Sequence, residues 1–352
     1  MTEEATPDVL TVIEGGVGRL RLNRPKAIHA LTMGMCETMI EALLAWRANP
    51  AVKLIMIDHT EGRGFCAGGD IRFLAESGAK DGRDAARFFF LEYQLNHLLF
   101  TYPKPVIAFM DGITMGGGVG ISQPARYRIA TERTVYAMPE SGIGLFPDVG
   151  GGWYLSRLPG RTGTYLALTG ARVDGADCIA LGLANHYIPS DKLEAVKAAL
   201  IADPDQVEAI VGREQLEPPA SAIVAQEADI DRLFASDRLE DIYAALAADP
   251  SEWAQKQLAT LRTKSPQTCK VALRELQYGA GFTDFADEMR MEYRIGAHLC
   301  RKHDFIEGVR ALIIDKDNQP KWNPATPEGV TEDLIDEIFA PLPEGEEWTP
   351  LL

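Results

Sequence analysis

The sequence is poor in the features that mark disulfide scaffolds, zinc sites and membrane-spanning proteins. Its 352 residues include only five cysteines, which are widely spaced and form no C-x-x-C pair. Neither a disulfide framework nor a zinc site is therefore indicated. No apolar run approaches the roughly 20 residues that cross a bilayer. The cysteines are Cys36, Cys66, Cys178, Cys269 and Cys300. These absences favour a protein of a reducing compartment.

Basic residues are also scarce, with 35 Lys and Arg against 51 Asp and Glu and a formal net charge of -16. This balance argues against nucleic acid as a partner, because phosphate binding depends on clustered Lys and Arg. The N-terminal stretch Met1 to Asp8 has neither the apolar core of a signal peptide nor the Arg-rich character of a mitochondrial presequence. We expect a cytoplasmic protein of a prokaryote, or an organelle-matrix protein whose presequence has been removed.

Apolar patterning alternates between short strands and longer helices over the first two hundred residues. Val9 to Ile13 and Val17 to Leu22, separated by two glycines, predict a β-hairpin. Met35, Met39, Leu43 and Trp46 have helical spacing and predict a helix over this stretch. Further helices are expected over 87–102, 116–123, 162–169 and 193–202, with strands over 52–57, 106–110, 128–131, 134–138 and 186–188. This alternation indicates an α/β fold.

A change in composition near Pro204 divides the chain. Residues 1–203 predict the α/β core, and residues 204–352 predict a helical C-terminal region that packs on it. Asp304 and Glu307 have the spacing of a helix capping box. The expected buried stripe of this last helix comprises Phe305, Val309, Leu312 and Ile313.

Two glycine-rich turns each follow an apolar strand and precede a helix. They are Gly62 to Asp70 and Asp111 to Gly120, the second with the triplet Gly116-Gly117-Gly118. A glycine turn alone is more typical of packing than of catalysis, and neither turn fits the G-x-G-x-x-G pattern of a dinucleotide site. As a pair, they favour two backbone N–H groups that stabilise an oxyanion.

Three acids stand where the sequence is otherwise apolar. Glu140 and Asp148 each follow a proline within an apolar stretch, and Glu92 shares a helical face with Phe88 and Leu95. Acids of this kind occur either as satisfied buried groups and turn caps or as general acids and bases. The sequence alone leaves both interpretations open.

The motifs together resemble the enoyl-CoA hydratase/isomerase (crotonase) superfamily. They are Phe65-Cys-Ala-Gly-Gly-Asp70, Met115-Gly-Gly-Gly-Val-Gly120 and Met138-Pro-Glu140. Ile143 to Gly151 and His303 to Ala311 are similar to the 3-hydroxyisobutyryl-CoA hydrolase branch of this superfamily, and the likeness runs from about Val9 to Pro324. It implies a crotonase spiral of ββα units with a helical C-terminal region.

The resemblance also implies roles for individual residues. Gly69 and Gly117 would supply the oxyanion N–H groups, and Glu140 and Asp148 would be catalytic. The substrate would contact Glu92, Gly117, Glu140 and Asp148. Coenzyme A would bind Lys26, Ala27, Ile28, Ala67, Gly68, Asp70, Ile71 and Arg72, with Lys26 and Arg72 near its phosphates, although both also fit plain surface charge. The partner would be an acyl-CoA, with no separate cofactor and no metal, in a homo-oligomer such as a trimer or hexamer.

One position departs from the superfamily pattern. Hydratases of this superfamily carry a catalytic glutamate two residues after the glycine triplet, where this chain has Gly120. Because glycine cannot transfer a proton, the resemblance implies hydrolysis of a short 3-hydroxyacyl-CoA, above all 3-hydroxyisobutyryl-CoA in valine breakdown. Glu140 would be the nucleophile or the general base, and Asp148 would orient the 3-hydroxyl or relay a proton. An enoyl-CoA isomerase or hydratase, and a catalytically idle scaffold or binding protein, are the alternatives.

Overall fold

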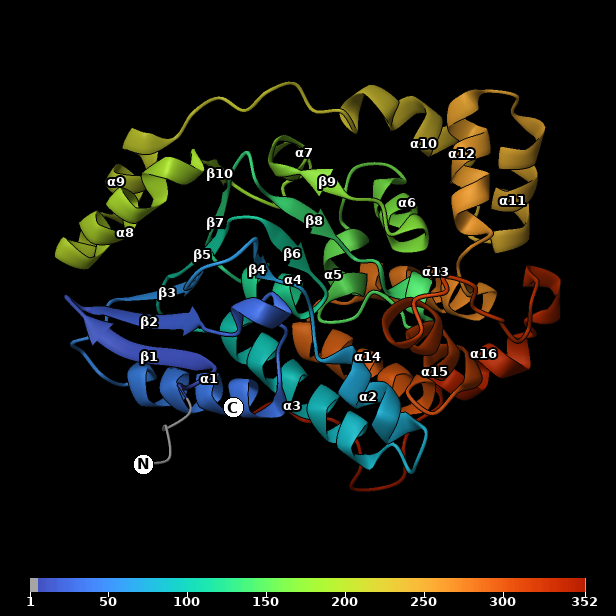
Figure 1. Ribbon diagram of the computed structural model, residues 1–352, viewed down its shortest axis with the longest axis horizontal. Coiled ribbons are helices and arrows are strands. Elements are labelled where there is room, and N and C mark those ends of the chain that lie inside the picture. The colour runs from blue at the N-terminus through green and yellow to red at the C-terminus, as the bar shows by residue number, and fades with distance from the viewer. Residues whose placement is uncertain (1–5, 352) are drawn as a thin grey trace. The chain divides into compact units, whose positions relative to one another are not determined.

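A computed structural model describes residues 6–351, and it has the predicted mixed α/β architecture (Figure 1). The chain divides into two compact units, each assembled from three segments. Unit 1 comprises Met1–Gly69, Leu95–Tyr136 and Val173–Ser221, and unit 2 comprises Asp70–Gln94, Ala137–Arg172 and Ala222–Leu352. Residues 1–5, which entered the argument about a presequence, lie outside the described residues. The division predicted at residue 203 stays a prediction.

Unit 1 contains a six-stranded sheet of order β1-β2-β3-β5-β7-β10. β1 and β2 form the predicted antiparallel hairpin, and the pairs that follow are parallel. The strands are β1 (Val9–Glu14), β2 (Val17–Leu22), β3 (Leu54–His59), β5 (Val106–Met110), β7 (Tyr127–Ala130) and β10 (His186–Tyr187). Because β3 and β5 are parallel, their C-terminal ends lie at the same edge of the sheet. One glycine turn follows each of these strands along the chain.

A smaller four-stranded sheet of order β4-β6-β8-β9 holds the glycine turns. Its strands are β4 (Gly64–Cys66), β6 (Ile113–Met115), β8 (Val135–Ala137) and β9 (Val173–Asp174). β4 and β6 are parallel neighbours, with Gly64 opposite Ile113 and Cys66 opposite Thr114. The two turns therefore leave adjacent strands in the same direction.

Helices cover both faces of the larger sheet in unit 1 (Figure 1). Side chains of α8 (Leu193–Ala202) and α9 (Val207–Glu214) form one buried cluster with Val17 and its neighbours. On the opposite face, Trp46 of α1 (Met33–Arg47) lies against Gly18, where a Cβ would be 2.5 Å from Trp46 Cε3. α4 (Gly117–Ser122) and α7 (Gly175–Ala180) also belong to unit 1.

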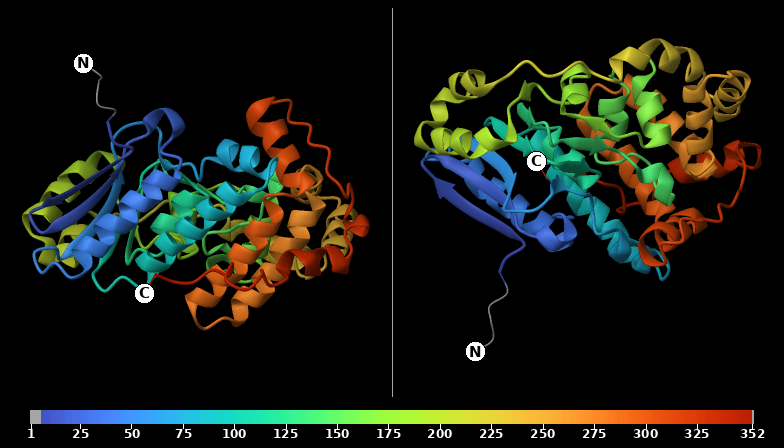
Figure 2. Two further views of the ribbon diagram at one scale, coloured as in Figure 1. Left: turned by 90° about the horizontal axis from the view of Figure 1, so that it is seen from below. Right: turned by 45° about the horizontal axis from the view of Figure 1, so that its top comes forward.

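Unit 2 is mainly helical (Figure 2), and α13 and α14 both contact α5. α3 runs through both units along the chain, and its residues 83–94 belong to unit 2. The helices are α2 (Ile71–Gly78), α3 (Arg83–Phe100), α5 (Gly151–Leu155), α6 (Thr162–Thr169), α10 (Glu227–Leu233), α11 (Leu239–Ala248), α12 (Glu252–Leu261), α13 (Pro266–Gly281), α14 (Phe285–Leu299), α15 (His303–Val309) and α16 (Glu332–Phe339). The predicted helical character of the C-terminal region is confirmed.

The predicted capping box at Asp304 and Glu307 is wrong. α15 begins at His303, and Lys302 in the cap position makes no side-chain capping bond. Asp304 is buried instead, and its carboxylate accepts hydrogen bonds from Ser265 Oγ and Asn323 N. The stripe of this helix is half right, since Phe305 and Val309 are buried but Ile313 is 38 % exposed. A π-helical turn at Arg310–Ile314 changes the residue spacing and turns Ile313 outward.

Candidate active site

The two glycine turns adjoin each other in unit 1. A Cβ on Gly68 would lie 3.7 Å from Gly116 Cα and 3.8 Å from Gly117 N, and a Cβ on Gly118 would lie 2.4 Å from Cys66 O. The close approach at Gly118 excludes a side chain there, and Gly68 is required by its φ of 115°. Gly117 is the first residue of α4 and follows Gly116 at φ 48°, so its N–H has no acceptor within the helix.

The predicted coenzyme A loop lies beside the first of these turns. Pro25–Ala27 forms a 3₁₀ turn, Ala67 N donates to Ile28 O over 2.9 Å, and Leu31 N donates to Gly68 O over 2.7 Å. The structure therefore brings Ala27, Ile28, Ala67 and Gly68 into one part of unit 1. Lys26 is exposed and forms no ion pair within residues 6–351.

The other predicted coenzyme A residues open α2 in unit 2. Asp70 caps this helix by accepting a hydrogen bond from Phe73 N. Ile71 is half-buried, and Arg72 is exposed without an ion pair in the described part of the chain. Asp70 thus has a structural role in the helix whether or not it contacts a ligand.

Glu140 begins a 3₁₀ turn, Glu140–Ile143, that is fixed on both sides in unit 2. Ser141 Oγ donates to Leu168 O, and Ser265 N donates to Ser141 O. Glu140 itself is only 5 % exposed, and its Oε2 has no hydrogen-bond partner. A buried carboxylate oxygen without a partner is costly when the group is charged.

Asp148 lies in the turn between this 3₁₀ segment and α5. Its Oδ2 accepts a hydrogen bond from Tyr93 Oη at 2.8 Å, and Gly151 N donates to its main-chain oxygen. The next residue, Val149, has φ 56°, a left-handed conformation that is strained for a β-branched side chain. The turn that carries Asp148 is therefore held in an unfavourable backbone geometry.

Glu92, Glu140 and Asp148 form one electrostatic group in unit 2. Glu92 is 2 % exposed, and its Oε1 has no partner. Burial, and secondly the charges of Asp148 and Glu140, raise the pKa of Glu92 well above its usual value. Burial and the charge of Asp148 likewise raise the pKa of Glu140, and burial raises the pKa of Asp148 to about 7. The predicted inward orientation of Glu92 is confirmed, and the three acids are close enough to affect one another.

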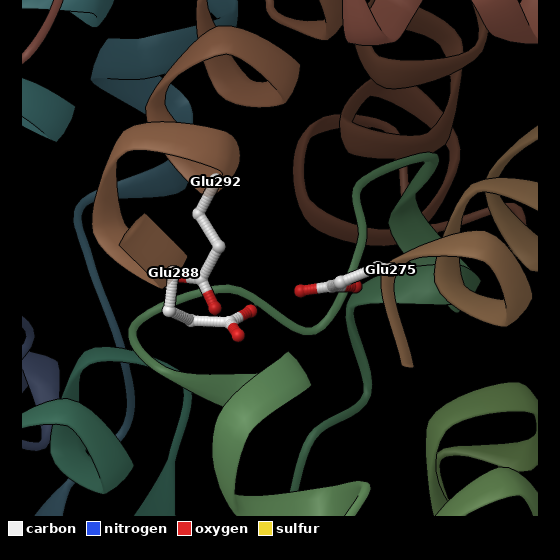
Figure 3. A group of neighbouring side chains, drawn as sticks. All are labelled: Glu275, Glu288 and Glu292. Atoms are coloured by element: carbon white, nitrogen blue, oxygen red, sulfur yellow. The ribbon is translucent and has the colours of Figure 1, made fainter. Parts of the chain in front are cut away.

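A second group of acids lies at the Gly150 end of the turn that carries Asp148. Glu288 and Glu292 project from α14 toward Glu275 of α13 (Figure 3), and oxygens of all three lie within 4.8 Å of one another. Both carboxylate oxygens of Glu292 accept the N–H of Gly150, at 3.0 and 2.8 Å. Burial raises the pKa of Glu288 to about 8. This group is defined here as the α13–α14 glutamates.

Sequence reasoning missed three residues that contact or perturb the acids. They are Tyr93, Glu292 and Lys264, whose positive charge lowers the pKa of Glu140. Glu292 carried a signal, because it follows Phe285 and Glu288 at helical spacing on an otherwise apolar face. The partners of Tyr93 and Lys264 lie more than 50 residues away along the chain, so no local pattern marks them.

A surface hollow of about 400 Å³ lies elsewhere in unit 2, between α11, α13 and α16. Its lining includes Arg238, Lys270 and Arg274, and none of the predicted site residues. Lys270 and Arg274 are already paired with Glu240 and Glu332.

Among the described residues no helix is both long and apolar enough to traverse a bilayer.

The glycine turns, the buried acids and the sheet order agree with a match to the family model for enoyl-CoA hydratase/isomerase, which covers residues 17–339. The chain belongs to the enoyl-CoA hydratase/isomerase family. The predicted superfamily is thereby confirmed.

Curated members of the family resemble this chain over most of their length. The mitochondrial 3-hydroxyisobutyryl-CoA hydrolase of Xenopus laevis is 43% identical over 337 residues, which cover 93% of this chain and 87% of the relative. The human enzyme of the same name is 39% identical over 348 residues, 96% of this chain and 90% of the relative. The likeness to the hydrolase branch is confirmed.

Solved structures confirm the crotonase fold. A carnitinyl-CoA dehydratase from Mycobacterium thermoresistibile matches with a TM-score of 0.93 at 44% identity, covering 98% of this chain and 99% of the other. An enoyl-CoA hydratase from Rhodobacter sphaeroides matches with a TM-score of 0.91 at 38% identity, covering 97% and 100%. Relatives named for hydrolysis and relatives named for water addition or removal therefore share this architecture.

Proposed function

We propose that the protein is an acyl-CoA thioester hydrolase that converts 3-hydroxyisobutyryl-CoA to 3-hydroxyisobutyrate and coenzyme A. The observation that carries the proposal is the buried pair Glu140 and Asp148, combined with a glycine at position 120. Family members of about 40% identity that carry this name support the choice of substrate.

Glu140 is proposed to act on the thioester carbon. Its carboxylate either attacks that carbon, so that the C–S bond breaks, coenzyme A leaves as the thiolate and water then hydrolyses the anhydride to free Glu140 and the acid, or it removes a proton from the attacking water. Both routes need ionised Glu140. Burial and the charge of Asp148 raise the pKa of Glu140, and the nearby positive charge of Lys264 partly offsets that rise in favour of the ionised form. Oε2 of Glu140 is not engaged by any hydrogen bond within the described residues, so it can turn to a substrate without breaking a contact of the fold.

Asp148 is proposed to orient the 3-hydroxyl of the acyl group or to relay a proton, and Glu92 to contact the same substrate. The hydrogen bond from Tyr93 fixes the Asp148 carboxylate through its Oδ2. This placement suits a substrate with a hydroxyl, because a site built to pair a hydroxyl discriminates strongly against analogues that lack it.

Gly69 and Gly117 are proposed to donate their N–H groups to the thioester oxygen as it becomes negative. Each such donor contributes about 2.7–4 kcal/mol to transition-state stabilisation. The close approach of the two turns in unit 1 supports this role. Lys26, Ala27, Ile28, Ala67, Gly68, Asp70, Ile71 and Arg72 are proposed to bind coenzyme A, with exposed Lys26 and Arg72 meeting its phosphates.

Hydration is the second candidate, because two solved relatives are named as a hydratase and a dehydratase. Gly120 argues against it. Position 120 lies in α4 and carries no side chain, so a second glutamate is missing from the place where hydratases of this superfamily carry one. Of the two positions where hydratases carry glutamates, only position 140 has one here. A single acid suits hydrolysis better than coordinated addition of water.

Release of free thiol tests the proposal. Purified protein is expected to release coenzyme A from 3-hydroxyisobutyryl-CoA, measured with a thiol reagent, and to do so faster than from the unhydroxylated isobutyryl-CoA. Absence of thiol release across a panel of short 3-hydroxyacyl-CoAs would falsify it.

Tyr93→Phe is expected to shift the acidic limb of the pH–rate profile to higher pH. The hydroxyl of Tyr93 lowers the pKa of Asp148, so its removal raises that pKa and delays ionisation of Asp148 as pH rises. A hydrogen bond to a charged group is worth about 1.5–3 kcal/mol, which predicts a loss of about tenfold or more in kcat below pH 7 and a smaller loss at pH 9. An equal loss at every pH would assign Tyr93 to packing alone.

Three wider features complete the proposal. No separate cofactor is required, since coenzyme A arrives as part of the substrate. The compartment is an organelle matrix, as the mitochondrial names of the relatives suggest, or the cytoplasm of a prokaryote. The assembly is a homo-oligomer, either a trimer or a hexamer.

A further inference from the structure

The turn from Asp148 to Gly150 combines strain with a catalytic role in the proposed reaction. Val149 has φ 56° and Gly150 has φ 94°, so two consecutive residues are left-handed. Such a conformation is strained for valine and persists only where the surroundings enforce it. A contact from outside the turn must therefore hold it in this conformation.

Glu292 makes the direct contact with this turn from a different element. Gly150 N lies 3.0 Å from Glu292 Oε1 and 2.8 Å from Oε2. Glu292 is fully buried, so this bond is shielded from water. In the left-handed turn the N–H of Gly150 points away from its own chain, and Glu292 is the acceptor that satisfies it.

The helix that carries Glu292 is itself fixed against the segment after the turn. Phe285, seven residues earlier on α14, packs against Trp153 and Tyr154 of α5 with ring centroids 5.6 and 5.8 Å apart. A Cβ on Gly150 would lie 2.6 Å from Tyr154 and 3.0 Å from Phe285. α14 therefore presents Glu292 from a rigid platform, close behind Asp148.

A cation site explains the α13–α14 glutamates less well than this hydrogen bond does. Both oxygens of Glu292 face a backbone N–H, which is a donor and repels a metal ion. Glu275 and Glu288 are fully buried, and burial raises the pKa of both. Their burial and raised pKa values therefore indicate that both side chains are uncharged carboxyl groups.

The geometry points to Glu292 as a positioning residue that holds the Asp148 turn in its strained conformation through the N–H of Gly150. This inference rests on the proposed hydrolysis for its kinetic consequence, whereas the structural part stands on the contact itself. Glu292 touches no reacting group in this role, since it acts through the main chain of Gly150.

The test compares variants of one helix. Glu292→Leu removes the acceptor at similar volume, Glu292→Gln keeps one amide oxygen for Gly150, and Glu288→Leu removes a carboxyl one helical turn earlier that makes no bond to the turn. We expect Glu292→Leu to lower kcat by about 10- to 100-fold with KM little changed, because a misplaced catalytic group costs up to about 10²-fold. Glu292→Gln and Glu288→Leu are expected to retain most of kcat.

Amide hydrogen exchange of the peptide containing Gly150 gives a readout that needs no substrate. Exchange at this position is expected to be at least about tenfold faster in Glu292→Leu than in wild type, Glu292→Gln or Glu288→Leu. Protection of Gly150 that survives in Glu292→Leu overturns the inference, as does an equal kinetic loss in Glu292→Leu and Glu288→Leu.

Where Glu292→Leu fails to fold, Glu292→Asp, which is one methylene shorter, is expected to show the same faster exchange. If wild type releases no thiol, the proposed function fails and exchange alone decides the role of Glu292.

Discussion

Replacing Glu140 by glutamine is expected to lower kcat for thiol release by about 10³-fold, the largest effect of any substitution considered. The carboxamide neither attacks a thioester nor accepts a proton from water at neutral pH, and general-base or nucleophilic groups contribute about 10²–10⁴-fold. Steady-state thiol release at pH 8 measures the loss. Because the change is nearly isosteric and removes a buried acid, the fold is expected to survive.

Glu275→Gln provides the matched control for this variant. Glu275 is likewise a fully buried glutamate of unit 2, its oxygens also lack partners, and it is not among the proposed catalytic groups. Its kcat is expected to stay close to wild type, and coenzyme A affinity is expected to be unchanged in both variants. A similar loss of kcat in both would show that buried charge, rather than chemistry at Glu140, limits the rate.

Asp148→Asn is expected to lower kcat by about 10²-fold while it stabilises the protein at high pH. The amide still accepts the Tyr93 hydrogen bond, so the turn keeps its contact, but it cannot accept a proton. The activity loss is expected to be smaller for a substrate without the 3-hydroxyl, because that substrate gains nothing from Asp148. Equal losses for both substrates would contradict the orienting role.

The stability effect follows from the direction of the pKa shift. Burial raises the pKa of Asp148 from 3.8 to about 7 in the folded protein. The folded state therefore holds a proton that the unfolded chain releases between about pH 4 and pH 7, and stability from this group falls as pH rises through that range. Asparagine does not titrate. Thermal unfolding should show a higher Tm for Asp148→Asn at pH 8 and a Tm near wild type at pH 4.5.

Local sequence patterns predicted the regular elements well where one physical rule dominates. The hairpin of β1 and β2 follows from apolar strands separated by turn glycines, and the helices α6 and α8 follow from apolar residues at helical spacing. β4 was not predicted as a strand, since three residues within a glycine-rich turn carry no periodicity. At α15 the capping spacing of Asp304 was overridden, because its carboxylate meets Ser265 from a distant segment.

The residues of the candidate site were likewise predictable only where a local sequence pattern marked them. The inward orientation of Glu92 followed from helical spacing, and the burial of Glu140 and Asp148 from their apolar surroundings. Tyr93, Lys264 and Glu292 became evident only from contacts between segments far apart in sequence. The assignment of Gly69 and Gly117 depended on family resemblance, since a glycine turn alone has the same appearance in packing and in catalysis.

The most direct test of the account follows both possible products from one substrate. Purified protein is incubated with 3-hydroxyisobutyryl-CoA, while free thiol and the absorbance of the enoyl-CoA formed by loss of water are recorded together. Hydrolysis predicts one equivalent of thiol per substrate consumed and no enoyl signal, with both absent in Glu140→Gln. An enoyl signal without thiol would contradict the account and assign the protein to the hydratases.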